Sequence, residues 1–126
     1  MAVFDYVAVD AGGRIGVLAV RRAIAPQAGA LALPGGFIEL GESWQAAAAR
    51  ELREETGVDL PASAVRLLTV HSAPDVLIVF GQVEPLPQAS LPPLLPTAEA
   101  SEIVILTAPV ELAFPLHTLV LREFLG

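Results

Sequence analysis

The 126-residue chain contains no cysteine, which excludes disulfide cross-links and thiolate chemistry. Although 54% of its residues are hydrophobic, it has no apolar run close to the roughly 18 residues that a membrane-spanning helix needs. Its longest apolar stretches, such as 76–80 and 103–106, have the length of strands. Residues 1–9 also lack the basic start of a signal peptide. We therefore expect one domain over residues 1–126, no membrane association, and a cytoplasmic location.

Positive charge is also scarce, because the chain has seven arginines, no lysine and 14 acidic residues, for a net charge of −7. Such a surface repels the phosphate backbone, so DNA or RNA is not an expected partner. A small nucleotide bound together with a divalent cation is compatible with this charge. The high hydrophobic content indicates a patch that a homodimer would bury.

Hydrophobic periodicity predicts the order strands, helix, strands, helix, an α+β pattern in which helices cover a central sheet. The predicted strands are 3–9, 15–20, 31–33, 65–72, 76–83 and 102–106, with turns at 10–13, 34–36 and 73–75 and an irregular proline-rich loop at 84–97. A final amphipathic helix is predicted over 115–124, with Leu116, Leu119, Val120 and Phe124 on one side.

Other residues allow more than one interpretation. Phe4 and Tyr6 alternate with Val3 and Asp5, so the two rings share a face and would pack in the core or stack on a nucleobase. His71 and His117 stand alone in apolar surroundings, and we predict no functional role for either.

The most informative stretch is GFIELGESWQAAAARELREETGV, from Gly36 to Val58. It predicts a helix with Ser43 as N-cap and Gly57 as the residue that ends it. On that helix the side chains at 51, 54 and 55 are all glutamates and lie on one face, where like charges repel. This crowding of carboxylates favours a role in holding a cation.

The simpler alternative is a solvated acidic face, with Arg50 and Arg53 as ordinary helix partners. Three features argue against it. A fourth carboxylate, Glu42, comes just before the helix, and a Pro-Gly-Gly sequence at 34–36 would let the backbone approach a ligand closely. The opposite helix face is rich in alanine, which is typical of tight packing on a sheet.

This stretch resembles the Nudix box, whose pattern is Gly, five residues, Glu, seven residues, Arg-Glu, an apolar residue, any residue, Glu-Glu, any residue, Gly and an apolar residue. The matching positions are Gly36, Glu42, Arg50, Glu51, Leu52, Glu54, Glu55, Gly57 and Val58. The resemblance implies the Nudix fold, an α/β/α sandwich with a central mixed sheet flanked by helices. It also implies that water attacks the pyrophosphate of a nucleoside diphosphate linked to another moiety.

The resemblance further implies a Mg²⁺ cofactor, with Mn²⁺ as an alternative, since hard cations take oxygen ligands. Its expected ligands are Glu51, Glu54 and Glu55, with Glu42 and the Gly35 carbonyl as further candidates. We expect Arg50 to orient a carboxylate of the box rather than to clamp substrate. The general base stays open between a box glutamate, Glu99 and Glu102, and the last two also fit an ordinary exposed pair beside a strand.

Candidate substrate contacts are Arg21, Arg22, Gly35, Gly36, Glu39 and Pro74. Pro74 lies sixteen positions beyond Val58, as in ADP-ribose hydrolases of the family, although a turn alone would explain it. The longer signature of NADH-cleaving members is absent. We expect a small nucleotide substrate of the ADP-ribose or nucleotide-sugar type. The alternatives are a pyrophosphohydrolase that cleanses the nucleoside triphosphate pool, a catalytically silent nucleotide sensor and a structural partner domain.

Overall fold

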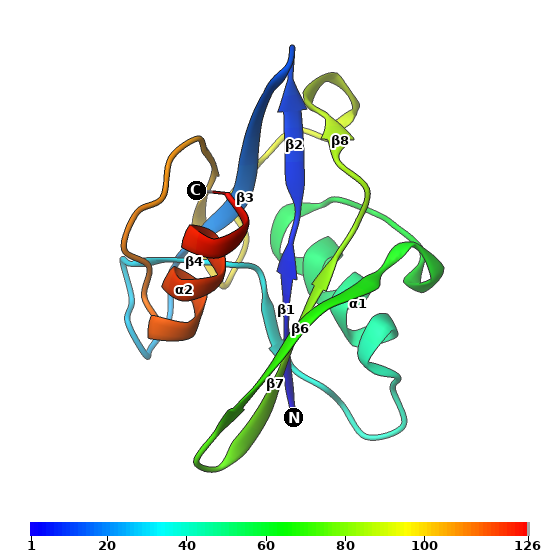
Figure 1. Cartoon of the computed structure of the whole chain (residues 1–126), viewed down its shortest axis with the longest axis vertical. Coiled ribbons are helices and arrows are strands. Elements are labelled where there is room, and N and C mark those ends of the chain that lie inside the picture. Colours follow the sequence, from blue (N-terminus) through cyan, green and yellow to red (C-terminus); the bar gives the residue numbers. More distant parts are fainter. Residues whose placement is uncertain (126) are drawn as a thin grey trace.

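The computed structural model describes residues 1–125 and contains two mixed sheets. The first has the order β5 (Gly35–Phe37), β1 (Ala2–Tyr6), β7 (Val76–Gln82) and β6 (Arg66–Ala73). The second has the order β4 (Leu31–Ala32), β3 (Arg14–Arg22), β2 (Ala8–Ala11) and β8 (Leu86–Pro87), with β9 (Ala100–Leu106) also paired to β3. Helices α1 (Trp44–Thr56) and α2 (Pro115–Phe124) lie on opposite sides of these sheets, giving three layers (Figure 1).

The predicted strand over 3–9 is divided at Val7, where the chain passes from the first sheet to the second. β1 pairs in parallel with β7, whereas β2 pairs antiparallel with β3. The Val7 carbonyl still accepts a hydrogen bond from the Leu18 N–H at 3.0 Å, so the two sheets meet without a gap at this point. The predicted α+β fold, with a mixed sheet flanked by helices, is confirmed, and its central layer consists of two sheets joined by one extended segment.

The predicted turn at 34–36 is wrong, because Gly35 and Gly36 belong to strand β5 and pair with Phe4 and Val3 of β1. A side chain at Gly35 would run into the Val3 carbonyl and the Phe4 ring. The two glycines are therefore explained by the close approach of two strands, a packing feature that resembles a turn signal in the sequence.

Helix α1 begins and ends as predicted. The Ser43 hydroxyl accepts a hydrogen bond from the Ala46 N–H, and Gly57 adopts a left-handed conformation with φ 81°. Its buried face carries the small side chains of 47–49 and the larger Leu52, which lets the helix lie close to β1 and β5. This short distance brings the acidic end of the helix against strand β5.

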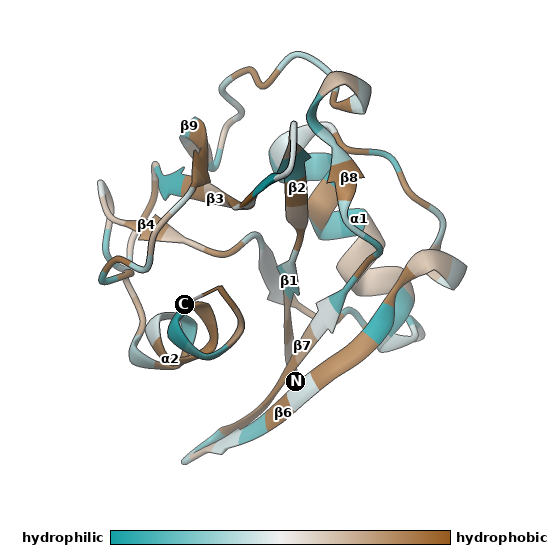
Figure 2. Ribbon diagram, turned by 45° about the horizontal axis from the view of Figure 1, so that its top comes forward, coloured by the Kyte–Doolittle hydropathy of each residue, from teal (hydrophilic) through white to brown (hydrophobic). Residues whose placement is uncertain are grey.

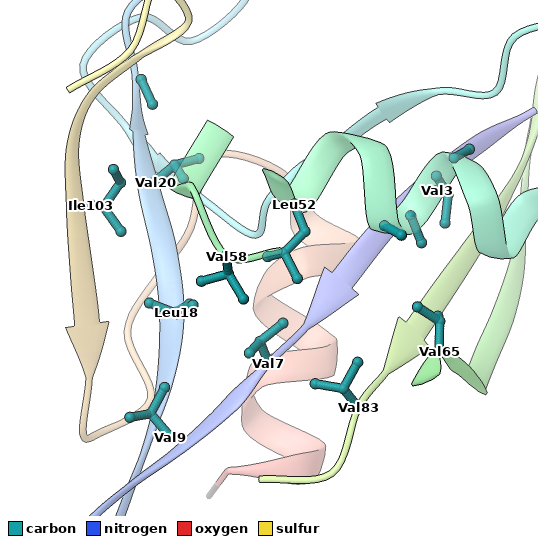
Figure 3. Packing of buried hydrophobic residues seen from close by; sticks show 14 of the residues in the cluster. Val3, Val7, Val9, Leu18, Val20, Leu52, Val58, Val65, Val83 and Ile103 are labelled. Carbon is teal, nitrogen blue, oxygen red and sulfur yellow. The ribbon is translucent and has the colours of Figure 1, made fainter. Parts of the chain in front are cut away.

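The core has two parts, one on each side of the sheets. Under α1, valines and leucines from β1, β2 and β3 meet Leu52 and Val58 (Figure 3). Under α2, Tyr6, Leu33 and Phe80 pack against Val120 and Leu121. The predicted shared face of Phe4 and Tyr6 is confirmed, and both rings pack in this second core. Neither helix of the described chain is long and apolar enough to cross a membrane.

The buried face of α2 differs from the prediction. His117, Thr118, Val120 and Leu121 are buried, whereas Leu119 is 47% exposed. The His117 ring lies 4.2 Å from the Phe4 ring and its Nδ1 accepts a hydrogen bond from the Leu33 N–H at 3.2 Å. The prediction counted histidine as polar and therefore placed Leu119, rather than His117, on the buried face of the helix.

The remaining segments follow the prediction with one exception. β6 and β7 form the predicted hairpin, which extends from the body of the molecule (Figure 1) and is largely apolar (Figure 2). The proline-rich segment is not wholly irregular, because it contains the short strand β8 and the 3₁₀ turn η2 (Gln88–Ser90). A second 3₁₀ turn, η1 (Ala62–Ala64), follows α1.

The buried histidine predicts a pH-dependent stability. Burial, with a smaller effect of the Arg22 charge, lowers the pKa of His117 to about 3. Between the unfolded value of about 6.5 and this folded value, only the unfolded chain binds the proton, so stability falls as the pH falls. We expect the unfolding free energy of the wild type to fall by about 2 kcal/mol more than that of His117→Gln between pH 7 and pH 5, with the slope approaching about 1.4 kcal/mol per pH unit below pH 6.

Urea denaturation of both proteins between pH 7 and pH 5 measures this difference. The carboxylates contribute equally to both curves and cancel. Parallel dependence of the two unfolding free energies on pH would contradict the neutral, buried state of His117.

Candidate functional site

Three carboxylates from two distant segments meet at the side of α1 that faces β5. Glu51 and Glu55 come from the helix, and Glu99 comes from the residue just before β9. One oxygen of each lies within 4.8 Å of the others. Glu51 and Glu55 are only 8% and 6% exposed, while Glu99 is exposed.

The position of Glu99 is set by the backbone. Its carbonyl accepts a hydrogen bond from the Ala23 N–H at 3.0 Å, at the end of β3. The adjoining loop is closed by a hydrogen bond from the Thr97 N–H to the Ala100 carbonyl at 2.8 Å. The side chain therefore starts from a fixed point beside the helix.

The protein neutralises this group of carboxylates only in part. The Gly35 N–H donates to Glu55 Oε2 at 2.8 Å, and an Arg50 nitrogen donates to Glu51 Oε1 at 2.9 Å. Burial, together with a hydrogen bond to Glu51 and the charges of Glu51 and Glu99, raises the pKa of Glu55 to about 9. Carboxyl oxygens that converge in this way match the donors that a hard divalent cation takes, so the residues fit the metal that the Nudix resemblance implies.

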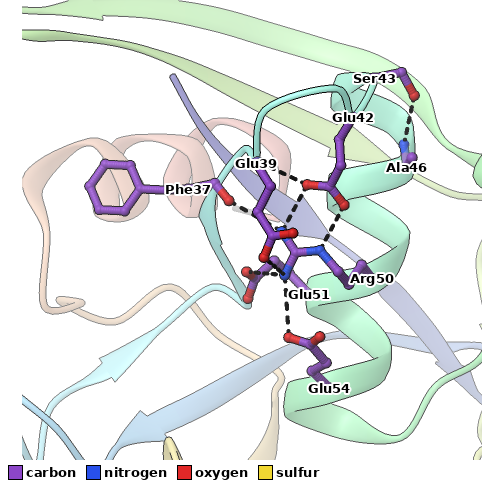
Figure 4. A network of polar contacts seen from close by, with 8 residues as sticks. All are labelled: Phe37, Glu39, Glu42, Ser43, Ala46, Arg50, Glu51 and Glu54. Carbon is purple, nitrogen blue, oxygen red and sulfur yellow. Dashed lines mark hydrogen bonds and ion pairs between the residues drawn. The ribbon is translucent and has the colours of Figure 1, made fainter.

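Arg50 holds the neighbouring acidic residues together (Figure 4). Its Nε and Nη2 form a two-point contact with Glu42, at 2.7 and 2.9 Å. Nη1 reaches Glu51 and, at 3.3 Å, Glu54, while Nη2 also donates to the Phe37 carbonyl. Each of its five N–H groups therefore has a protein acceptor, and none is free for a phosphate oxygen.

These contacts have opposite effects on the two partners. The hydrogen bond from Arg50, with a second from the Glu39 N–H, lowers the pKa of Glu42 to about 2. The hydrogen bond to Glu42 in turn raises the pKa of Arg50 above its already high value. The pair is therefore ionised at neutral pH, and we infer that it holds the start of the helix and the preceding segment together.

The structure separates Glu99 from Glu102, while a glutamate of the box stays a further candidate base. Glu99 lies in the carboxylate group, whereas Glu102 forms an ion pair with Arg21 at 2.9 Å on the surface of β3 and β9. Glu42 and Glu54 contact Arg50 and lie outside the group of three.

The predicted substrate contacts lie in several separate parts of the fold. Besides Glu102, Arg21 binds the Gly29 carbonyl, while Arg22 binds the Pro26 carbonyl and lies over the Phe114 ring. Glu39 is largely exposed, and Pro74 lies in the β6–β7 turn. The roles of these residues stay predictions.

The sequence reasoning missed Asp5. This residue is 1% exposed, and neither carboxylate oxygen has a hydrogen-bond partner within residues 1–125. Burial, with a contribution from the charge of Glu51, raises its pKa well above the ordinary value. The available signal was a single acidic residue at an inward position of an apolar strand.

Gly36 couples strand β5 to the site. A methyl group added there would lie 2.7 Å from Glu51 Oε1, which is the end of a flexible side chain that can move aside. We expect Gly36→Ala to fold but to weaken Mn²⁺ binding about 10- to 100-fold, measured by calorimetry.

The neighbouring glycine provides the contrast. Gly35→Ala places its methyl group against the Val3 backbone, which cannot move aside, so we expect a loss of about 2 kcal/mol or more of unfolding free energy. Equal effects of both variants on stability, with unchanged Mn²⁺ affinity in Gly36→Ala, would contradict this division of roles.

Comparison with known proteins gives a consistent result. Residues 2–123 match the NUDIX domain family. Over 59 residues the chain is 46% identical to an ADP-ribose pyrophosphatase from Methanocaldococcus jannaschii, a stretch that covers 47% of this chain and 34% of that protein. The chain therefore spans about a third of the length of this relative.

Two crystal structures show the same fold at 26% identity. A bifunctional NMN adenylyltransferase/ADP ribose pyrophosphatase from Francisella tularensis, complexed with AMP and a Mn ion, aligns with a TM-score of 0.76 over 99% of this chain and 41% of its own. A NUDIX hydrolase from Nitrosomonas europaea aligns with a TM-score of 0.75 over 98% of this chain and 68% of its own.

Proposed function

Because this chain belongs to the NUDIX domain family, we propose that it hydrolyses the pyrophosphate bond of a nucleoside diphosphate linked to another moiety, with ADP-ribose as the favoured type of substrate. The observation that carries the proposal is the convergence of Glu51, Glu55 and Glu99 beside strand β5, whose first two residues are glycines. The ADP-ribose pyrophosphatase relative supports the choice of substrate.

In this proposal Glu51 and Glu55 hold a divalent cation, Mg²⁺ or Mn²⁺, and Glu99 lies beside them. Glu54, one turn from Glu51 and half exposed, and the Gly35 carbonyl are further ligands. When bound, the cation neutralises phosphate oxygens and lowers the pKa of a water molecule. The Mn ion in the Francisella structure supports this choice of cofactor.

The protein's own residues then have separate roles. Arg50 orients Glu51 and Glu42, since its donors are all engaged. Glu99, the exposed member of the group, is the proposed general base that takes the proton of the attacking water. Oxygen from water bonds to one phosphorus and the bridging P–O bond breaks, so ADP-ribose would yield AMP and ribose 5-phosphate.

A substrate panel with and without Mg²⁺ tests the activity. It contains ADP-ribose, NADH, nucleotide sugars and ordinary and oxidised nucleoside triphosphates, and it scores nucleoside monophosphate and pyrophosphate. We expect metal-dependent release of AMP from ADP-ribose. Pyrophosphate released from triphosphates instead would indicate the pool-cleansing alternative, and nucleotide binding without any cleavage would indicate a sensor.

The carboxylate group predicts a sharp contrast between variants. We expect Glu55→Gln to lower kcat by about two orders of magnitude or more, because a buried ligand of the cation is lost. The matched control is Glu102→Gln, which breaks only an exposed ion pair and leaves kcat within about threefold.

A second readout separates metal binding from folding. Mn²⁺ should raise the Tm of the wild type and of Glu102→Gln, and the shift should be much smaller for Glu55→Gln. Equal kcat and equal Tm shifts in both variants would refute the proposed metal site.

A further inference from the structure

Two large hydrophobic side chains are exposed next to the carboxylates. Leu40 is 106% exposed and Phe37 is 74% exposed, the two highest values among the large exposed hydrophobic residues of the described chain. Both lie in the segment from the end of β5 to the start of α1, which also supplies Glu39 and Glu42 to Arg50. Exposed apolar surface rimmed by polar residues is typical of interaction and ligand-binding sites.

Phe37 differs from every other phenylalanine in the chain. Phe4, Phe80, Phe114 and Phe124 each lie near another aromatic ring or histidine, at centroid distances from 4.2 to 6.0 Å. Phe37 has no such partner among residues 1–125. Its neighbour across β1 is Ala2, whose methyl group is too small to cover a ring.

The backbone of Phe37 is nevertheless firmly held at the site. The residue pairs with β1, and its carbonyl accepts a hydrogen bond from Arg50 at 3.3 Å. A Cβ added to the preceding residue, Gly36, would lie 2.7 Å from Glu51 Oε1. Because side chains alternate along a strand, the Phe37 ring lies on the other face from that carboxylate. Figure 4 shows the ring pointing away from Arg50 and the glutamates.

We propose that Phe37 forms the stacking platform for the nucleobase of the bound nucleotide, a subsite that rests on the proposed function. In a nucleotide whose phosphates lie at the carboxylates, the ribose separates the nucleobase from the phosphates, so the base lies outside the charged cluster. A phenylalanine on a paired strand supplies a flat apolar face with little conformational freedom to lose. Stacking on one ring selects for a planar base and discriminates only weakly between bases.

Two probes separate stacking from phosphate binding. AMP and ribose 5-phosphate share a ribose 5-phosphate unit, but only AMP has a base. Calorimetry in the presence of MgCl₂ compares the wild type with Phe37→Ala and Phe37→Tyr. We expect Phe37→Ala to weaken AMP binding about tenfold or more, while Phe37→Tyr retains it and ribose 5-phosphate affinity stays within twofold.

Leu95→Ala is the control, because it removes another exposed side chain, 65% exposed, from the proline-rich loop. It should leave the affinity for both probes unchanged. Loss of both probes to the same extent in Phe37→Ala would overturn the proposal, as would the absence of AMP binding by the wild type. So would a dimer that dissociates in Phe37→Ala with AMP affinity intact, since a second copy would then be what covers the ring.

These binding measurements do not depend on hydrolysis. If ADP-ribose is not cleaved but AMP binding depends on Phe37, the proposed function fails and the platform stands. If ADP-ribose is cleaved with a KM that does not change in Phe37→Ala, the function stands and the platform fails.

Discussion

The site depends on the ion pairs that the guanidinium group of Arg50 forms with four carboxylates. Glu39, Glu42, Glu51 and Glu54 all lie within 3.8 Å of its nitrogens, and their mutual repulsion would otherwise oppose the folded state. A lysine at this position would offer a single point of charge and could not bond to Glu42 at two points while also reaching Glu51. Arg50 therefore stabilises an arrangement in which, within residues 1–125, Glu55 and Glu99 have no cationic partner. The raised pKa of Glu55 follows from this, and the proposed metal would favour its ionised form.

Strand β5 connects this group of charged side chains to the core of the protein. Its two glycines let β1 and the acidic side of α1 come closer than any side chain would allow. The same three-residue strand donates a backbone N–H to Glu55, touches Glu51 and accepts a hydrogen bond from Arg50. Its last residue exposes the ring that we propose as the nucleobase platform. A short strand at the edge of a sheet thus links the core, the proposed metal ligands and the proposed nucleotide subsite.

The sequence predicted the helix ends and the hairpin correctly, because capping and turn residues act on their immediate neighbours. Ser43 and Gly57 mark the ends of α1 because capping acts within one turn, and the β6–β7 hairpin follows from its tight turn. The errors arose where distant packing decides. Gly35 and Gly36 were predicted as a turn but pair with β1. His117 was left out of the predicted apolar face of α2, although it is buried and accepts a hydrogen bond from the Leu33 N–H.

The sequence by itself determined the family, the helix that carries the glutamates, and their presence on one face, because periodicity and spacing are properties of a single segment. Only the tertiary structure shows that Glu99, and not Glu102, lies beside the carboxylates of the helix. Both stand near the start of one strand, yet the backbone contacts of Glu99 with the end of β3 bring it to the helix, while Glu102 pairs with Arg21. It also decided that Asp5 is buried beside the site and that Phe37 is left uncovered, since burial depends on which segments meet.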